Sequence, residues 1–94
     1  MLLTIDIGNT HTVIGVFDGE RLVADWRMAS VTHRTADENW LTVRSFCADA
    51  GIDPARITGV GISSVVPDLT GGYERMTRIH LHLDAVTVSS SLAQ

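Results

Sequence analysis

Three β-rich segments at the amino-terminal end are separated by connections so short that only tight turns can join them. The apolar segment 1–7 is followed by Gly8-Asn9-Thr10, and the segment 12–17 is followed by Asp18-Gly19 and the alternating segment 21–28. Asp-Gly between two apolar runs is a strong hairpin signal. Because strands joined by such turns pair antiparallel, the first third of the chain is predicted to form a three-stranded antiparallel sheet.

Helix and strand signals alternate in the rest of the chain. Thr35 and Glu38 have the spacing of a capping box, apolar residues follow at helical spacing, and Gly51 is placed to end the helix. The later elements are predicted as a strand over 57–66 stopped by Pro67, a weaker helix over 69–81 and a fifth strand over 85–88. The predicted fold class is therefore α/β, with a mixed five-stranded sheet in the chain order β-β-β-α-β-α-β and helices on its faces.

Composition limits what the chain can bind. Its 94 residues make one small domain at most, and a hydrophobic content of 45% is high for so small an interior. Part of the apolar surface is therefore expected to meet another domain or another chain. The formal net charge is −4, and the seven basic residues, all of them Arg, form no basic cluster. A nucleic-acid surface is not expected.

Cysteine usage and hydropathy indicate a cytoplasmic protein. Cys47 is the only cysteine, which excludes an internal disulfide and a cysteine-rich zinc site, and its neighbours Phe46 and Ala48 predict a buried helical thiol. A reducing cytoplasm agrees with this pattern. No apolar run reaches the length of a membrane span, and no basic leader precedes the first strand. Neither a membrane anchor nor a signal peptide is therefore expected.

The segment Asp6-Ile7-Gly8-Asn9-Thr10-His11-Thr12 carries the clearest chemical signal. Gly8 lets the backbone approach an anion, exposed N–H groups of a turn can form an anion-binding concavity, and Thr10 and Thr12 add hydroxyl donors. Asp6 would repel a phosphate directly, but it can hold Mg²⁺, and the metal then bridges to phosphate oxygens. An ordinary Gly-Asn hairpin has the same turn chemistry. An ionised carboxylate at the end of an apolar strand needs a partner, and this favours the phosphate-binding interpretation.

The same residues carry a family resemblance. Asp-x-Gly-Asn-Thr after an amino-terminal strand resembles the phosphate-binding loop of the acetate kinase–sugar kinase–heat-shock protein–actin superfamily, whose half-domains are ribonuclease H-like. Three segments in chain order are similar to those of type III pantothenate kinases: residues 6–12, Arg34-Thr35-Ala36-Asp37-Glu38 and Ser63-Ser64-Val65-Val66-Pro67. The resemblance covers the whole chain but only the amino-terminal part of the family. Residues 1–94 are thus expected to form a single nucleotide-phosphate-binding domain, apparently truncated, with the second domain absent.

The resemblance implies an activity and a set of ligands. The full-length parent would transfer phosphate from ATP to pantothenate, giving 4'-phosphopantothenate in the first step of coenzyme A biosynthesis. ATP, Mg²⁺ or a similar divalent ion, and a monovalent cation such as K⁺ are the implied cofactors, and a homodimer is the implied assembly. The residues implied to bind the nucleotide and its metal are Asp6, Gly8, Asn9, Thr10, His11 and Thr12, and Asp6 would act through the metal rather than by touching phosphate. His11 stands where the family usually has a small polar residue.

No catalytic residue is assigned in this chain. The family's proposed base is the Asp of a Gly-x-Asp-Arg motif, and that motif does not occur in the sequence. The chain alone is therefore expected to be inactive. Two alternatives stay open: a non-catalytic nucleotide-binding or regulatory module related to accessory transcription factors, and a fragment of a longer gene product.

Other polar residues have simpler interpretations. Ser63 and Ser64 either line the expected nucleotide-binding cleft or end their strand, and the second interpretation is favoured. His80 and His82 are two residues apart on a predicted helix, so their side chains would not face each other. A zinc pair is not expected there.

Overall fold

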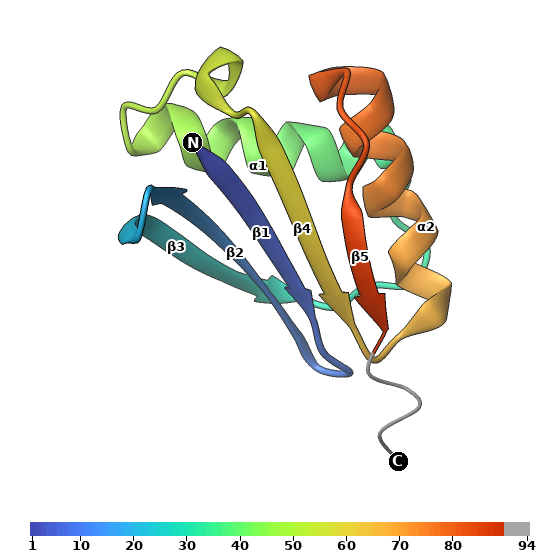
Figure 1. Ribbon diagram of the computed structural model, residues 1–94. Coiled ribbons are helices and arrows are strands. Elements are labelled where there is room, and N and C mark those ends of the chain that lie inside the picture. Colours follow the sequence, from blue (N-terminus) through green and yellow to red (C-terminus); the bar gives the residue numbers. More distant parts are fainter. Residues whose placement is uncertain (90–94) are drawn as a thin grey trace.

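A computed structural model provides the structure of the protein and describes residues 1–89. Five strands and two helices follow one another in the predicted order (Figure 1). Their bounds are β1 Leu2–Ile7, β2 His11–Asp18, β3 Arg21–Ala29, α1 Ala36–Asp49, β4 Gly59–Ser64, α2 Pro67–Met76 and β5 Val86–Ser89. A short 3-10 helix, Pro54–Arg56, precedes β4, and a π-helical turn, Thr77–Leu81, follows α2.

The five strands form one mixed sheet in the spatial order β3-β2-β1-β4-β5. The β1–β2 and β2–β3 pairs are antiparallel, whereas β1–β4 and β4–β5 are parallel. The antiparallel amino-terminal sheet and the α/β fold class are thus confirmed. A consequence of this topology is that β1, β3, β4 and β5 all end at the same edge of the sheet, where the β1–β2 turn also lies (Figure 1).

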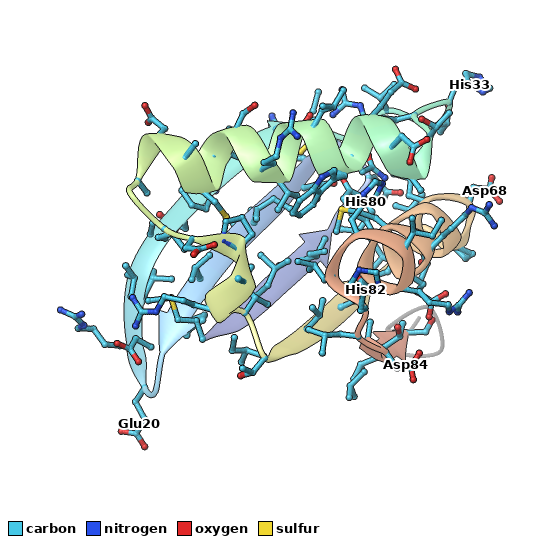
Figure 2. All side chains as sticks on the ribbon, turned by 90° about the horizontal axis from the view of Figure 1, so that it is seen from above. Glu20, His33, Asp68, His80, His82 and Asp84 are labelled. Carbon is cyan, nitrogen blue, oxygen red and sulfur yellow. The ribbon has the colours of Figure 1, made fainter. Side chains whose placement is uncertain are left out.

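Both helices cover the same face of the sheet, and no element of residues 1–89 covers the other face. Strand alternation turns Leu3, Ile5 and Ile7 of β1 toward the helices, where they are at most 1% exposed. Figure 2, seen from above, shows α1 and α2 on one side of the strands, and the two helices contact each other. The reason lies in the crossovers: β3 to β4 and β4 to β5 join parallel strands and advance in the same direction, so right-handed connections put both helices on one face.

The predicted capping box starts α1. The Glu38 N–H donates to Thr35 Oγ1 at 3.2 Å, and the Thr35 N–H donates to Glu38 Oε1 at 3.0 Å. These two hydrogen bonds to Thr35 lower the pKa of the Glu38 carboxyl. Farther along α1, Val43 and Cys47 are fully buried against the sheet. The helix stops before Gly51, whose φ of 71° is a conformation that glycine adopts without strain.

The second helix differs from the sequence prediction at both ends. Pro67 is the first residue of α2, and β4 already ends at Ser64; the fixed φ of proline suits the first helical position, where no backbone N–H bond is lost. The predicted single helix over 69–81 changes to a π-helical turn at Thr77 and ends at His82, whose φ is 57°. Apolar spacing alone does not distinguish these two helix types.

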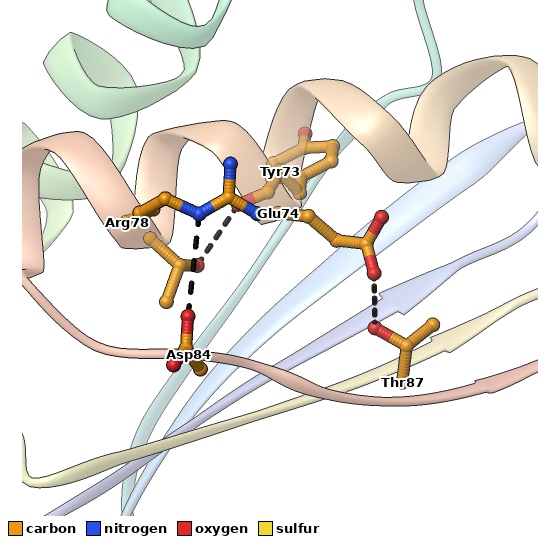
Figure 3. A network of polar contacts seen from close by, with 6 residues as sticks. Tyr73, Glu74, Arg78, Asp84 and Thr87 are labelled. Atoms are coloured by element: carbon orange, nitrogen blue, oxygen red, sulfur yellow. Dashed lines mark hydrogen bonds and ion pairs between the residues drawn. The ribbon is translucent and has the colours of Figure 1, made fainter.

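Polar contacts fix α2 and the π-helical turn to their neighbours. Thr87 Oγ1 of β5 donates to Glu74 Oε2 at 2.8 Å (Figure 3). His80 lies between the two helices (Figure 2), with Nε2 2.8 Å from Asp37 Oδ1 and its ring stacked on Trp40 at 5.3 Å. The Thr87 contact joins β5 to α2, and the His80 contacts hold the π-helical turn against the start of α1. None of the helices within residues 1–89 is long and apolar enough to cross a membrane.

Candidate phosphate-binding site

The segment singled out in the sequence lies at the edge where the parallel strands end. The turn after β1 is beside the carboxyl ends of β4 and β5 and the amino-terminal end of α2 (Figure 1). In open α/β sheets, ligands bind outside the carboxyl ends of the strands. The position of the turn therefore suits a ligand site.

The backbone of the turn contains two N–H donors without an acceptor in the part of the chain that the structure describes. The Gly8 N–H donates to the His11 carbonyl at 3.0 Å, and a Cβ on Gly8 would lie only 3.0 Å from that same oxygen. Within residues 1–89 the N–H groups of Asn9 and Thr10 have no hydrogen-bond acceptor, and both residues are exposed. Adjacent backbone N–H groups that are free in a turn are suited to bind an anion.

Asp6 lies next to this turn, at the end of β1 and on the open face. Its neighbours across the strands are Val13 and Ser63. The carboxylate is exposed and forms no hydrogen bond or ion pair with any residue that the structure describes. Residues 1–89 contain no cluster of three or more potential metal-ligating side chains. Mg²⁺ commonly binds through one or two carboxylates, waters and substrate phosphates, so Asp6 fits such an ion.

Thr12 does not join the exposed part of the site. The side chain is 0% exposed and lies on the helix-covered face, because alternation along β2 puts His11 and Val13 on the opposite side. Its hydroxyl forms a 2.9 Å hydrogen bond with Ser30 Oγ. The structure therefore places Asp6, Gly8, Asn9, Thr10 and His11 together at the edge and turns Thr12 inward, so the expected contact of Thr12 with phosphate is not supported.

Ser30 is the residue that the sequence analysis did not single out. It follows β3 directly, and its Oγ donates to the Gly8 carbonyl at 2.6 Å while its N–H donates to the Thr10 carbonyl at 2.9 Å. Ser30 is 22 positions from Gly8 in the sequence. Only the pairing of β3 with β2, which places Ala29 opposite His11, brings it to the turn.

The two serines at the end of β4 have different surroundings. Ser64 is buried; its Oγ accepts from the Val66 N–H at 3.0 Å and from Thr70 Oγ1 at 2.9 Å. This arrangement agrees with the favoured interpretation that the strand ends here. Ser63 instead faces the open side next to Asp6. A shallow hollow of about 290 Å³ on that face is lined by Thr4, Ile5, Asp6, Gly61, Ile62, Ser63, Val86 and Val88.

A second, smaller hollow lies on the helix side, between the β3–α1 connection and α2. It has a volume of about 110 Å³ and is lined by Ala29, Val31, Thr32, Arg34, Asn39, Asp68, Leu69, Gly72 and Tyr73. Asn39 is 3% exposed, and its Oδ1 has no partner among the described residues. Burial raises the pKa of the Tyr73 hydroxyl, which donates to the sulfur of Met28 at 3.7 Å. The hollow lies on the side of the sheet opposite Asp6.

Sequence comparisons identify relatives over nearly the whole chain. Residues 2–94 match the model of the family described as type III pantothenate kinase. The type III pantothenate kinase of Myxococcus xanthus is 51% identical over 77 residues, covering 82% of this chain and 30% of the relative. That of Roseiflexus castenholzii is 45% identical over 91 residues, covering 97% of this chain and 36% of the relative. The chain therefore spans about a third of the length of these curated relatives.

Solved structures with the same fold are more distant in sequence. A ROK hexokinase from Thermus thermophilus superposes with a TM-score of 0.70 at 16% identity, covering 95% of this chain and 35% of that one. YeaZ from Pseudomonas aeruginosa superposes with a TM-score of 0.61, also at 16% identity, covering 94% of this chain and 43% of that one. These likenesses confirm the α/β fold that the strand and helix order predicts.

Proposed function

Because the chain belongs to the type III pantothenate kinase family, we propose that it supplies the ATP phosphate-binding loop of an enzyme that phosphorylates pantothenate. The complete reaction, which gives 4'-phosphopantothenate as the first step of coenzyme A biosynthesis, is proposed for the full-length protein. The chain itself spans 30% and 36% of the two relatives described above. The observation that carries the proposal is the turn after β1, where two N–H groups without an acceptor among residues 1–89 lie beside an exposed carboxylate.

Different residues of the loop would bind the phosphates and the metal ion of a bound triphosphate. The N–H groups of Asn9 and Thr10, with the Thr10 hydroxyl, would donate to phosphate oxygens, and Gly8 keeps the turn tight enough for this approach. The Asp6 carboxylate would hold Mg²⁺ directly or through water. The positive charge of that ion would offset the negative charge of the phosphates during transfer. The chain contains no Lys, so the metal and the backbone donors would provide most of the neutralisation on this side of the nucleotide.

The rest of the proposal concerns the full-length protein. The proton acceptor for the pantothenate hydroxyl is not assigned to any residue of this chain, which lacks Gly-x-Asp-Arg. We therefore expect the chain alone to bind nucleotide without turning it over. A requirement for K⁺, a homodimeric assembly and a cytoplasmic location belong to the same proposal, and the resemblance to the family is what supports them.

The test is a titration of the 94-residue chain with ATP in the presence and absence of Mg²⁺. Asp6→Asn is expected to weaken Mg-ATP binding by about tenfold or more, because it removes a charged metal ligand, and to leave the thermal unfolding midpoint unchanged. Asp25→Asn is the matched control, since Asp25 is exposed on the same sheet but on β3.

Two outcomes would contradict the proposal. Equal Mg-ATP affinity of Asp6→Asn and the wild type would remove the metal role of Asp6, and no nucleotide binding by the wild type would remove the role of the loop. Pantothenate-dependent ADP release is measured in parallel with Mg²⁺ and K⁺ present. Clear release by this chain would mean that the base lies within it.

A further inference from the structure

Ser30 follows the end of β3 and is hydrogen-bonded to residues on both sides of the turn after β1. Its Oγ donates to the Gly8 carbonyl at 2.6 Å, its N–H donates to the Thr10 carbonyl at 2.9 Å, and its Oγ lies 2.9 Å from Thr12 Oγ1. Ser30 thus takes part in three hydrogen bonds, two with the turn and one with the start of β2. No other residue outside the segment 8–12 makes a hydrogen bond to the Asn9–Thr10 turn within the described part of the chain.

The direction of the hydroxyl hydrogens follows from the acceptors. A carbonyl oxygen can only accept, so the single hydrogen of the Ser30 hydroxyl is used on Gly8. Thr12 must then be the donor in the Thr12–Ser30 hydrogen bond. Since Thr12 is 0% exposed, water cannot readily replace it in this relay. The relay therefore runs from Thr12 through Ser30 to the Gly8 carbonyl.

The fixed carbonyl of Gly8 sets the direction of the next N–H group. The peptide between Gly8 and Asn9 is trans, because the described chain contains no cis peptide bond. In a trans peptide the C=O and the following N–H point in opposite directions. With the Gly8 C=O held toward Ser30, the Asn9 N–H is directed away from Ser30, where none of residues 1–89 accepts from it.

We propose that Ser30 is a positioning residue for nucleotide binding, which holds the Gly8–Asn9 peptide so that the Asn9 N–H is presented to a phosphate group. The inference rests on the proposed function of the loop and adds a residue that the loop sequence does not contain. It also gives Thr12 a defined role, because its buried hydroxyl orients Ser30. An unrestrained peptide could rotate its N–H inward, and ordering it on binding would weaken affinity.

The test compares Ser30→Ala, which removes the hydroxyl, with Ser30→Thr, which retains it. Two quantities are measured on the 94-residue chain: the affinity for Mg-ATP, and the ¹⁵N order parameters of Gly8, Asn9 and Thr10 without nucleotide. For Ser30→Ala we expect affinity to fall roughly tenfold, the scale of one lost hydrogen bond, and the order parameters to fall from about 0.85 toward 0.6. Ser30→Thr should stay close to wild type in both.

Ser45→Ala is the matched control, because Ser45 also donates its hydroxyl to a backbone carbonyl, that of Leu41, but on the exposed side of α1. Unchanged order parameters and unchanged affinity in Ser30→Ala would overturn the inference. If the wild type binds no nucleotide, the proposed function fails, and the order parameters alone decide whether Ser30 fixes the loop. If Ser30→Ala does not fold, Thr12→Val is used in its place, because it removes the hydroxyl that donates to Ser30. The same falls in Mg-ATP affinity and in the order parameters are expected.

Discussion

Gly8 lies where a side chain would be crowded by backbone. Its backbone N–H is bonded to the His11 carbonyl, and an added Cβ would approach that oxygen to 3.0 Å, closer than ordinary contacts allow. The oxygen belongs to the backbone at the start of β2, so it cannot move without shifting the strand. The sequence analysis expected Gly8 to let the backbone approach an anion, which stays a prediction; the His11 carbonyl is a separate reason, within the protein, for glycine at this position.

We expect Gly8→Ala to open the turn. The free energy of unfolding should fall by roughly 1–3 kcal/mol, as for other overpacked positions, and Mg-ATP affinity should fall with it. Gly61→Ala is the control, because a Cβ there meets nothing within 4 Å; it should be neutral or slightly stabilising. Chemical denaturation and nucleotide titration of both variants provide the measurement. Equal stability of Gly8→Ala and the wild type would show that the turn can relax without cost.

The face of β2 on which Thr12 lies cannot be inferred from its residue type. Its hydroxyl was expected to contact phosphate, but it lies on the covered face of β2 and bonds to Ser30. Adjacent residues of a strand point to opposite faces, so His11 and Thr12 cannot both face the ligand. The sequence places them in a strand but does not state which of the two faces is covered.

At the scale of single elements, α1 is the best predicted part of the chain. Its capping box, its buried Cys47 and its end before Gly51 all follow from local sequence. Local rules suffice there because each contact joins residues only a few positions apart. The end of α2 is harder to predict: the π-helical turn Thr77–Leu81 and the contact between His80 and Asp37 depend on how α2 packs against α1.

The capping box predicts a pH dependence of stability. The hydrogen bonds with Thr35 lower the pKa of Glu38 in the folded state below its ordinary value of 4.5. A carboxyl group with a lowered folded pKa stabilises the protein above its unfolded pKa, and the contribution is lost as pH falls through the folded pKa. Glu38→Gln still accepts a hydrogen bond but does not titrate. The wild-type unfolding midpoint should therefore drop more steeply than that of Glu38→Gln below about pH 4.5.

The control for this prediction is Glu20→Gln. Glu20 lies at the tip of the β2–β3 hairpin (Figure 2) and makes no hydrogen bond or ion pair within the described residues. Its variant should follow the wild-type pH profile. Parallel profiles of the wild type and Glu38→Gln between about pH 3 and 6 would contradict the role assigned to the ionised cap.

At the scale of the whole molecule, the described residues cover the sheet on one side only. The core lies between the strands and the two helices, whereas Val86 and Val88 on the open side are 71% and 60% exposed. The high hydrophobic content of the sequence led us to expect that part of the apolar surface meets another domain or another chain. The two valines are apolar surface of this kind, and their contact with a partner stays a prediction. Which face stays open was not predictable from composition.

The covered side of the sheet protects the single thiol. Cys47 is 0% exposed, and burial raises its pKa, so both access and thiolate formation are reduced. In the native protein its reaction with a disulfide reagent such as DTNB should be slow and should follow the population of unfolded chain as urea is added. A variant carrying Ser45→Cys, on the exposed side of the same helix, should gain one fast thiol. Fast modification of native wild type would mean that α1 separates readily from the sheet.

The sequence by itself determined the features that short-range contacts produce: the tight turns, the three-stranded antiparallel start, the cap of α1, the order of the elements and the resemblance in the loop. The tertiary structure decided which face the helices cover, that Thr12 points inward, and that Ser30 reaches Gly8 across 22 positions. The physical reason is that strand register and crossover handedness bring these groups together. A linear pattern records which residues alternate, but it does not record which residue of a distant strand will lie beside them.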